Sequence, residues 1–130
     1  MKELAEVYKS AGDETRLMIL ALLAQHGECC VCDVVEVCGV TQSKASRHLQ
    51  TLRHAGLVLD RREGTWVHYR LHPCPAGAAA EFLDANSLIL RGLRCDDLSA
   101  RISAWNKRKV AGVACRGLMT AQRCCGEDTP

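Results

Sequence analysis

The chain has 130 residues and a formal net charge of +2, with 48% hydrophobic and 25% charged residues, the composition of an ordinary soluble domain. It contains no apolar run near the roughly 20 residues that span a bilayer, and its first residues are too polar for a secretory signal. We therefore expect a cytoplasmic protein without a membrane partner, with one domain over residues 1–109 and a flexible, Cys-containing tail over residues 110–130.

The first elements predicted along the chain are a short helix and a long apolar one. Leu4 and Val7 indicate a first helix that ends at about Ser10. Asp13 is a suitable N-cap for the second helix, and Gly27 suits its C-terminus. Between them apolar residues recur at helical spacing, which predicts a buried spine: Leu17, Leu20, Ala21 and Ala24, flanked by Ile19, Leu22 and Leu23.

A helix–turn–helix is predicted next. A third helix over Val31–Cys38 ends at Gly39, and a tight turn leads to a fourth helix that begins at Thr41 or Gln42 and stops at Gly56. The fourth helix has an apolar inward face, made of Ala45, Leu49 and Leu52. Its other faces are polar and cationic: Gln42, Ser43, Lys44, Ser46, Arg47, His48 and Arg53. This division is typical of a recognition helix, which is anchored on one side and meets phosphates and base edges on the other.

Two short strands follow the recognition helix. Residues 58–62 and 66–71 have the β-branched and aromatic composition of strands, and Glu63–Gly64 supplies a turn between them. Three arginines, Arg61, Arg62 and Arg70, make this hairpin a basic wing. The fold expected up to this point is mainly α with a β-hairpin wing.

Two further helices are predicted after Pro73 and Pro75. The first carries a stripe of Phe82, Ile89 and Leu93, and the second, after a break near residues 92–97, carries Leu98, Ile102 and Trp105. The small central core cannot cover all of these side chains. We therefore expect a homodimer that forms through the terminal helices, because homodimers commonly bury such apolar surface.

Charge and cysteine content both point to function. Residues 41–72 carry six Lys or Arg and two Asp or Glu, whereas residues 1–40 carry three and seven. This local basic surface favours nucleic acid as a partner, with a merely solvated face as the alternative. Nine cysteines without a signal peptide favour metal binding or redox chemistry over a secreted disulfide framework. Cys38 and Cys95 have apolar neighbours, so burial in the core is equally open for them.

Four segments together resemble the ArsR/SmtB family of winged helix–turn–helix repressors: GDETRLMILALL, ECCVCDVV, TQSKASRHLQTLRHAGLV and GTWVHYRL. The resemblance covers roughly residues 5–72. It implies a dimer that holds double-stranded operator DNA and releases it when an inducer binds, without an organic cofactor and without enzymatic activity. It also implies a set of DNA-contacting residues, with Gln42, Ser43, Lys44, Ser46, Arg47 and His48 at the major groove and Arg61, Arg62 and Arg70 near the flanking backbone.

The inducer follows from the cysteines at the third helix. Cys30 to Asp33 resemble the CVCD signature of the arsenic- and antimony-responsive branch, which implies As(III) or Sb(III) as the ligand and Cys30 and Cys32 as thiolate ligands. That branch often adds a cysteine where this chain has Val35. We take Cys29 as the leading third ligand, and the alternatives are Cys38, Cys115, Cys124 and Cys125.

Other sensor types remain alternatives. Zinc sensors of the family use histidines of the last long helix, but Ala78–Lys109 contains none, and the cadmium/lead branch adds cysteines from an N-terminal arm, but residues 1–28 contain none. A thiol or persulfide redox sensor on the same scaffold stays open. A thiol–disulfide exchange enzyme is disfavoured, because the chain has CxC rather than CxxC and no βαβ pattern.

The spacing of the two cysteines suggests how an ion would act on DNA. Consecutive residues of a helix are turned by about 100°, so thiols at positions i and i+2 would point to nearly opposite sides. We therefore expect ion binding to unwind or shift the start of the third helix. That helix should pack on the recognition helix through Val34 and Val37, which would carry the strain to the DNA-binding surface.

Overall fold

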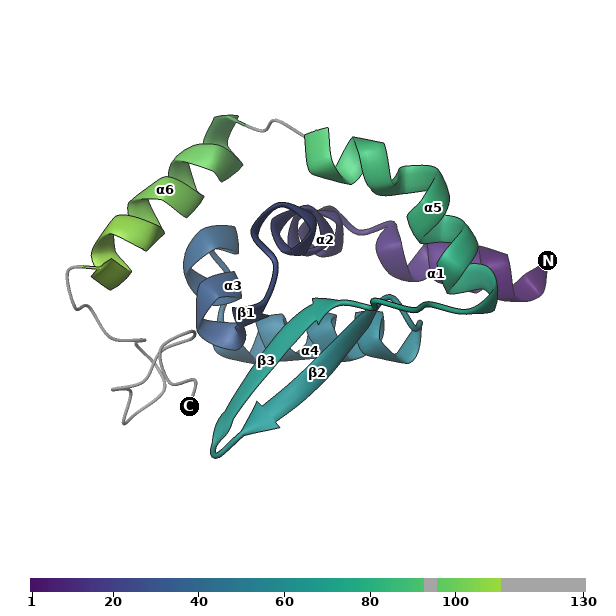
Figure 1. Cartoon of the computed structure of the whole chain (residues 1–130), viewed down its shortest axis with the longest axis horizontal. Helices are drawn as coiled ribbons and strands as arrows, with labels where there is room; N and C mark the ends of the chain where they lie inside the picture. Colours follow the sequence, from purple (N-terminus) through teal and green to yellow (C-terminus); the bar gives the residue numbers. More distant parts are fainter. Residues whose placement is uncertain (93–95, 111–130) are drawn as a thin grey trace.

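The computed structural model describes residues 1–92 and 96–110, and their helices surround a central helix while a hairpin projects from one side (Figure 1). The elements in chain order are α1 (Lys2–Ala11), α2 (Glu14–His26), β1 (Cys29–Cys30), α3 (Val31–Cys38), α4 (Gln42–His54), β2 (Val58–Glu63), β3 (Trp66–Leu71), α5 (Gly77–Gly92) and α6 (Asp96–Val110). Within these residues no helix combines the length and hydropathy that a bilayer span requires.

Helix α2 is the spine of the fold, as predicted. The Asp13 carboxylate caps its start by accepting hydrogen bonds from the backbone N–H groups of Thr15 and Arg16, at 2.9 and 3.2 Å. The residues from Ile19 to Leu23 are all buried. Leu20 and Ala21 of the predicted stripe are buried, but Leu17 is 39% exposed, and the five consecutive buried residues go round the whole helix instead of forming one stripe.

The helix–turn–helix is confirmed. Gly39 ends α3 in the left-handed region, with φ of 69°, which glycine adopts at little cost. Thr41 then caps α4, since its hydroxyl oxygen accepts from the backbone N–H of Lys44 at 3.2 Å. The predicted inward face of α4 is fully buried: Ala45, Leu49 and Leu52. Helix α4 ends at His54, two residues before the predicted stop at Gly56.

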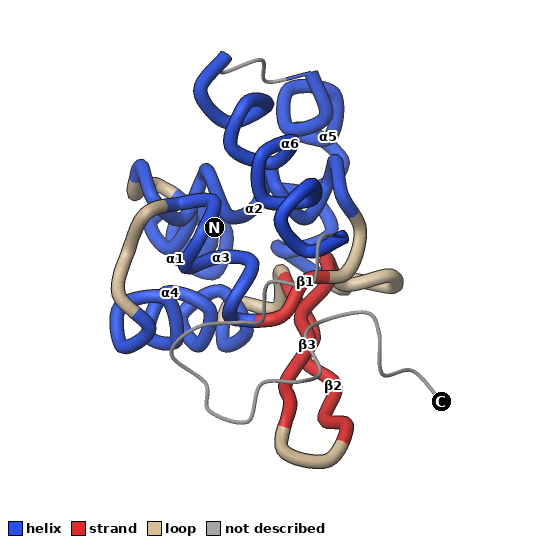
Figure 2. Tube along the Cα trace, turned by 90° about the vertical axis from the view of Figure 1, so that its left-hand side faces the viewer, coloured by secondary structure: helices blue, strands red, loops and turns tan. Residues whose placement is uncertain are grey.

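The wing is part of a three-stranded antiparallel sheet with the order β1-β3-β2. Strands β2 and β3 form the predicted hairpin, which extends away from the helices (Figure 2). Strand β1 was not predicted, because two residues are too short to show a period. Its pairing places Cys29 opposite Tyr69 and Cys30 opposite His68. Since strand side chains alternate, the two cysteines point to opposite faces of the sheet.

The terminal helices differ from the prediction in which residues they bury. Helix α5 packs against α1 and α2, and α6 packs against α3 (Figure 1). Phe82 and Leu90 of α5 are buried, but Ile89 is 60% exposed, so the predicted stripe through Ile89 is wrong. Trp105 of α6 is buried within the same chain rather than left over for a partner. Leu93, the side chain of Leu98, Cys95 and the predicted tail beyond residue 110 lie outside the described residues.

Candidate functional site

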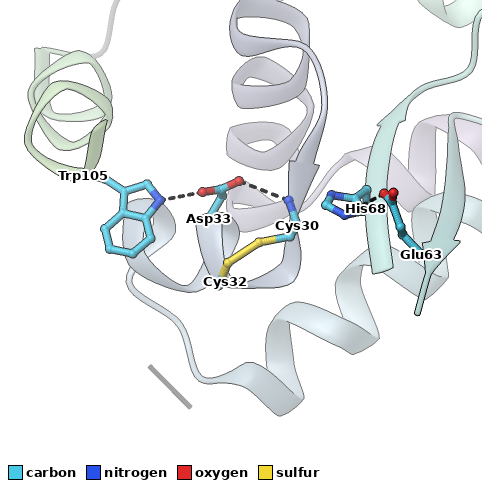
Figure 3. Close-up of a disulfide and its surroundings, with 6 residues drawn as sticks. All are labelled: Cys30, Cys32, Asp33, Glu63, His68 and Trp105. Carbon is cyan, nitrogen blue, oxygen red and sulfur yellow. Dashed lines mark hydrogen bonds and ion pairs between the residues drawn. A yellow bond between two sulfur atoms is a disulfide. The ribbon is translucent and has the colours of Figure 1, made fainter. Parts of the chain in front are cut away.

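Cys30 and Cys32 lie at the start of α3 with their sulfur atoms joined in a disulfide and their Cα atoms 5.3 Å apart (Figure 3). Cys30 is the N-cap of α3, with an extended backbone (φ −91°, ψ 173°), and Cys32 is the second residue of the helix. The predicted divergence of the two thiols is therefore wrong. The 100° turn between residues applies within a helix, and the N-cap residue lies outside it.

Asp33 completes a buried cluster with the two cysteines. The sulfur atoms of Cys30 and Cys32 and a carboxylate oxygen of Asp33 lie within 4.8 Å of one another, and no other such group of potential metal ligands occurs in residues 1–92 and 96–110. Cys29 does not join this cluster. Its side chain is packed in the hydrophobic core on the other face of β1, so the structure does not support its selection as the third ligand.

The Asp33 carboxylate forms one hydrogen bond within the cluster and one that joins the cluster to helix α6. One oxygen, Oδ2, accepts from the backbone N–H of Cys30 at 3.1 Å, and Oδ1 accepts from the indole N–H of Trp105 in α6 (Figure 3). Asp33 is only 2% exposed, so these bonds are shielded from water. Sequence analysis gave Asp33 no role of its own. An acidic residue three positions after an N-cap is a capping-box signal that could have revealed it.

The remaining cysteines of the described residues have different surroundings. Cys38 is buried at the end of α3, and this burial raises the pKa of its thiol to about 11. A thiol that stays protonated is a poor metal ligand. Cys38 is therefore assigned to the core, which is one of the two interpretations that the sequence left open for it. Cys74 is exposed in the segment between β3 and α5. Cys95, Cys115, Cys124 and Cys125 lie outside the described residues.

The wing brings a buried histidine to the same face of the sheet as Cys30. His68 is opposite Cys30 in the β1–β3 pairing and is 3% exposed. Its Nε2 atom lies 3.9 Å from Oε1 of Glu63 and has no hydrogen-bond partner among the described residues (Figure 3). The thiol cluster is therefore in direct backbone contact with the hairpin as well as with the start of α3.

The residues predicted to meet the major groove all lie on α4. Gln42, Ser43, Lys44 and Arg47 are exposed, whereas Ser46 and His48 are half-buried. Nη1 of Arg16, from α2, donates to Nδ1 of His48 at 2.9 Å. The pKa of His48 is lowered, mainly because the ring is partly buried. The exposed polar face needed for groove contacts is thus present. The contact of Arg16 with His48 was not predicted from the sequence.

The three wing arginines are not equivalent. Arg61 donates to both carboxylate oxygens of Glu28, at 2.8 and 3.1 Å, and to Glu63 at 2.7 Å, so its charge is compensated within the chain. Arg70 shares that face of the hairpin. Arg62 lies on the opposite face and lines a groove of about 250 Å3 together with Gln42 and Ser46 of α4. Arg62 alone of the three is placed beside the recognition helix.

Comparison with known proteins agrees with this architecture. Residues 13–59 match the profile of bacterial regulatory proteins of the arsR family. An arsenical resistance operon repressor of Escherichia coli is 49% identical over 79 residues, which are 61% of this chain and 68% of that protein. An arsenic resistance transcriptional regulator of Pseudomonas putida is 49% identical over 67 residues, which are 52% of this chain. The match spans about half of the Pseudomonas protein, at 52% of its length.

A solved structure extends the likeness to three dimensions. The homodimeric winged helix–turn–helix DNA-binding domain of a possible ArsR-family regulator from Mycobacterium bovis has a TM-score of 0.56 and 34% sequence identity. The similarity covers 68% of this chain and 78% of that one. Both the sequence matches and the shared fold place the helix–turn–helix and the wing in one family. The chain belongs to the ArsR family of bacterial regulatory proteins.

Proposed function

We propose that this chain is a transcriptional repressor that binds operator DNA as a homodimer and releases it when As(III) or Sb(III) binds to Cys30 and Cys32. The observation that carries the proposal is the meeting of the two sulfur atoms at the start of α3, the helix that packs against α4. Soft, thiophilic ions select thiolate ligands. The names of the Escherichia coli and Pseudomonas putida relatives support arsenic as the signal.

The reduced pair offers two thiolates, whereas a trivalent metalloid forms three bonds. Asp33 is an unsuitable third ligand, because its two oxygens already accept hydrogen bonds from Cys30 and Trp105. Its role in the proposal is to fix the start of α3. The third bond goes to a thiolate of Cys115, Cys124 or Cys125, or to a small thiol from solution. Replacing these three cysteines together by serine separates the two sources, because only the first predicts a weaker affinity for arsenite.

Coupling to DNA runs through the contacts of α3 in this proposal. Val34 and Val37 are fully buried and α3 packs on α4, while Asp33 joins α3 to α6. Unwinding of α3 is not required, because the two sulfurs already lie together at its N-cap. Conversion of an operator from mostly bound to mostly free requires the inducer to favour one state by about 5.5 kcal/mol. Metalloid–sulfur bonds that form only in one arrangement of α3 can supply this difference.

The DNA side of the proposal uses α4 and part of the wing. The exposed polar face of α4 reads the major groove, and Arg62 contacts the backbone beside it. Dimerisation uses α5, where Leu88 and Ile89 are 84% and 60% exposed in the single chain. The homodimeric state of the Mycobacterium bovis domain supports this expectation. Two recognition helices would then meet two half-sites one helical turn apart.

An operator gel shift with arsenite tests the proposal. Under reducing conditions the wild-type protein should bind the operator and release it on addition of arsenite. Cys30→Ser and Cys32→Ser should bind the operator equally well but resist release, because each loses one of two thiolates. Cys74→Ser is the matched control, since it removes an exposed cysteine between β3 and α5 and should respond like the wild type. Normal release of Cys32→Ser would rule out the proposed site.

The disulfide favours a second candidate, a redox-sensing repressor. Cys30 and Cys32 would lose two protons and two electrons to a peroxide or to a small disulfide, and the operator affinity would change with oxidation. Mass spectrometry of the protein with and without arsenite, under reducing conditions, separates the candidates. A mass increase of one arsenic atom with DNA release supports the first, and release that needs an oxidant supports the second. Cadmium and lead, titrated in parallel, test the alternative of a cadmium/lead-type sensor.

A further inference from the structure

A basic cavity lies where the first turn of α2 meets the recognition helix α4. Its volume is about 420 Å3, and its lining residues are Thr15, Arg16, Val40, Lys44, Arg47, His48 and Thr51. Three of them, Arg16, Lys44 and Arg47, are cations at neutral pH. Lys44 and Arg47 are exposed on the face of α4 that the proposed function assigns to DNA. The cavity is therefore continuous with that face.

Arg16 enters this cavity with most of its donors still available. Its Nε atom donates to the backbone oxygen of Ser10, and its Nη1 atom donates to Nδ1 of His48. A guanidinium group has five N–H donors, so three remain without an acceptor among the described residues. Arg16 is half-buried, and a cation in that position is stabilised by an anion that accepts from it.

The nearest acidic group does not serve as that anion. The Asp13 carboxylate accepts from the backbone N–H groups of Thr15 and Arg16 as the cap of α2. These backbone bonds, led by that of Arg16, lower the pKa of Asp13, and the guanidinium adds to this effect from nearby. Asp13 thus partly offsets the positive charge of the cavity, but it makes no ion pair with Arg16 in the part of the chain that the structure describes.

The contact with Arg16 also defines the state of His48. A guanidinium can only donate, so Nδ1 of His48 must accept and the ring proton resides on Nε2. Burial lowers the pKa of His48, which keeps the ring neutral. Arg16 therefore orients the ring and leaves its Nε2–H group as a donor.

We propose that this cavity binds one backbone phosphate of the DNA, with Arg16 as a contact from outside the helix–turn–helix that also positions His48. The inference rests on the proposed function, because it needs the recognition helix to lie in the major groove. A phosphate diester matches the fork of Arg16 and the neighbouring Lys44 and Arg47. Phosphate contacts of this kind fix the register of a protein on the duplex without reading its sequence.

Salt dependence of binding gives the first test, with a duplex selected from a random pool by the wild-type protein. Arg16→Gln should reduce the slope of log affinity against log salt by about one for each protomer. It should weaken binding to the selected duplex and to a random duplex by the same factor, about tenfold. Lys9→Gln, an exposed change on α1, is the control and should leave the slope unchanged. Circular dichroism and urea unfolding establish that each variant is folded.

A second test uses Arg16→Lys, which keeps the positive charge but removes the forked guanidinium group. This test remains informative even if the Arg16→Gln protein does not fold. Single neutral methylphosphonates are placed in turn along the selected duplex. At one phosphate of each half-site the wild type should lose about tenfold in affinity, whereas Arg16→Lys should lose less than threefold. An equal loss in both proteins at every phosphate would overturn the inference.

A third measurement separates DNA from free phosphate as the occupant. Inorganic phosphate and chloride are compared as competitors of DNA binding at equal ionic strength, and the two should act alike. Stronger competition by phosphate that disappears in Arg16→Lys would assign the cavity to the free ion and overturn the DNA assignment. If the wild type selects no duplex at all, the proposed function itself fails. If it selects one and Arg16→Gln keeps its slope, only the present inference fails.

Discussion

Helix α3 and helix α4 are neighbours in one helix–turn–helix, but they present opposite kinds of surface. Five of the eight residues of α3 are buried, including Cys32 and Asp33, whereas only three of the thirteen residues of α4 are buried. The chemistry of α3 therefore depends on backbone geometry and packing. That of α4 and the wing depends on which charges remain exposed. The difference teaches that the proposed sensor depends on where the buried side chains of α3 are placed, whereas the proposed DNA surface depends on which charged side chains are exposed.

The largest expected effect comes from removal of the buried carboxylate on α3. Asp33→Ala leaves the backbone N–H of Cys30 and the indole N–H of Trp105 without their acceptor, which should lower the free energy of unfolding by about 3 kcal/mol. Asp33→Asn keeps one acceptor oxygen and should cost about 1 kcal/mol. Urea unfolding monitored by circular dichroism measures both. Equal stability of Asp33→Ala and the wild type would show that packing on α3 does not depend on this carboxylate.

Thiol reactivity probes the same contrast between buried and exposed positions. Burial and the raised pKa of about 11 should make Cys38 at least about 100-fold slower to alkylate than the exposed Cys74. Peptide mapping by mass spectrometry after timed exposure to iodoacetamide gives both rates. Denatured protein, in which the two sites should react alike, is the control. Rapid labelling of Cys38 in the folded protein would contradict its assignment to the core.

On the exposed side, two arginines of the wing should differ in how much they contribute to DNA binding. Arg62→Ala should lower operator affinity about tenfold and reduce the salt slope by about one per protomer, because it removes a cation beside α4. Arg61→Ala should change the slope little, since Glu28 and Glu63 already compensate its charge. Affinities measured at several salt concentrations test the pair. A larger change for Arg61→Ala would reverse the assignment of the two faces.

The smallest effect concerns pH and the cap of α2. The pKa of Asp13 is lowered below 3.8 in the folded state, first by the backbone hydrogen bond from Arg16, so its charge stabilises the fold above that pH. This contribution is lost as the pH falls through the lowered pKa. Asp13→Ala should cost about 1 kcal/mol at pH 7, with a smaller difference from the wild type at pH 3. Urea midpoints at both pH values measure it, and a pH-independent difference would argue against an ionic cap.

Local patterns predicted most of the elements correctly. Asp13, Gly39 and Thr41 act on their own helix ends through hydrogen bonds or backbone angles a few residues away, so their positions were readable directly. Strand β1 escaped prediction because its two residues are defined only by pairing with β3, more than thirty residues later. The stripe through Ile89 failed for a similar reason, since the side of α5 that is buried depends on α1 and α2.

The sequence by itself determined the fold class and the helix–turn–helix, because these follow from spacing within about ten residues. Tertiary structure alone decided that Cys29 points away, that Asp33 bonds to Trp105, that Arg61 is compensated and that Arg16 supports His48. Each of these depends on two residues brought together across the chain. Side-chain direction and pairing at such distances are set by how the elements pack, which no local period encodes.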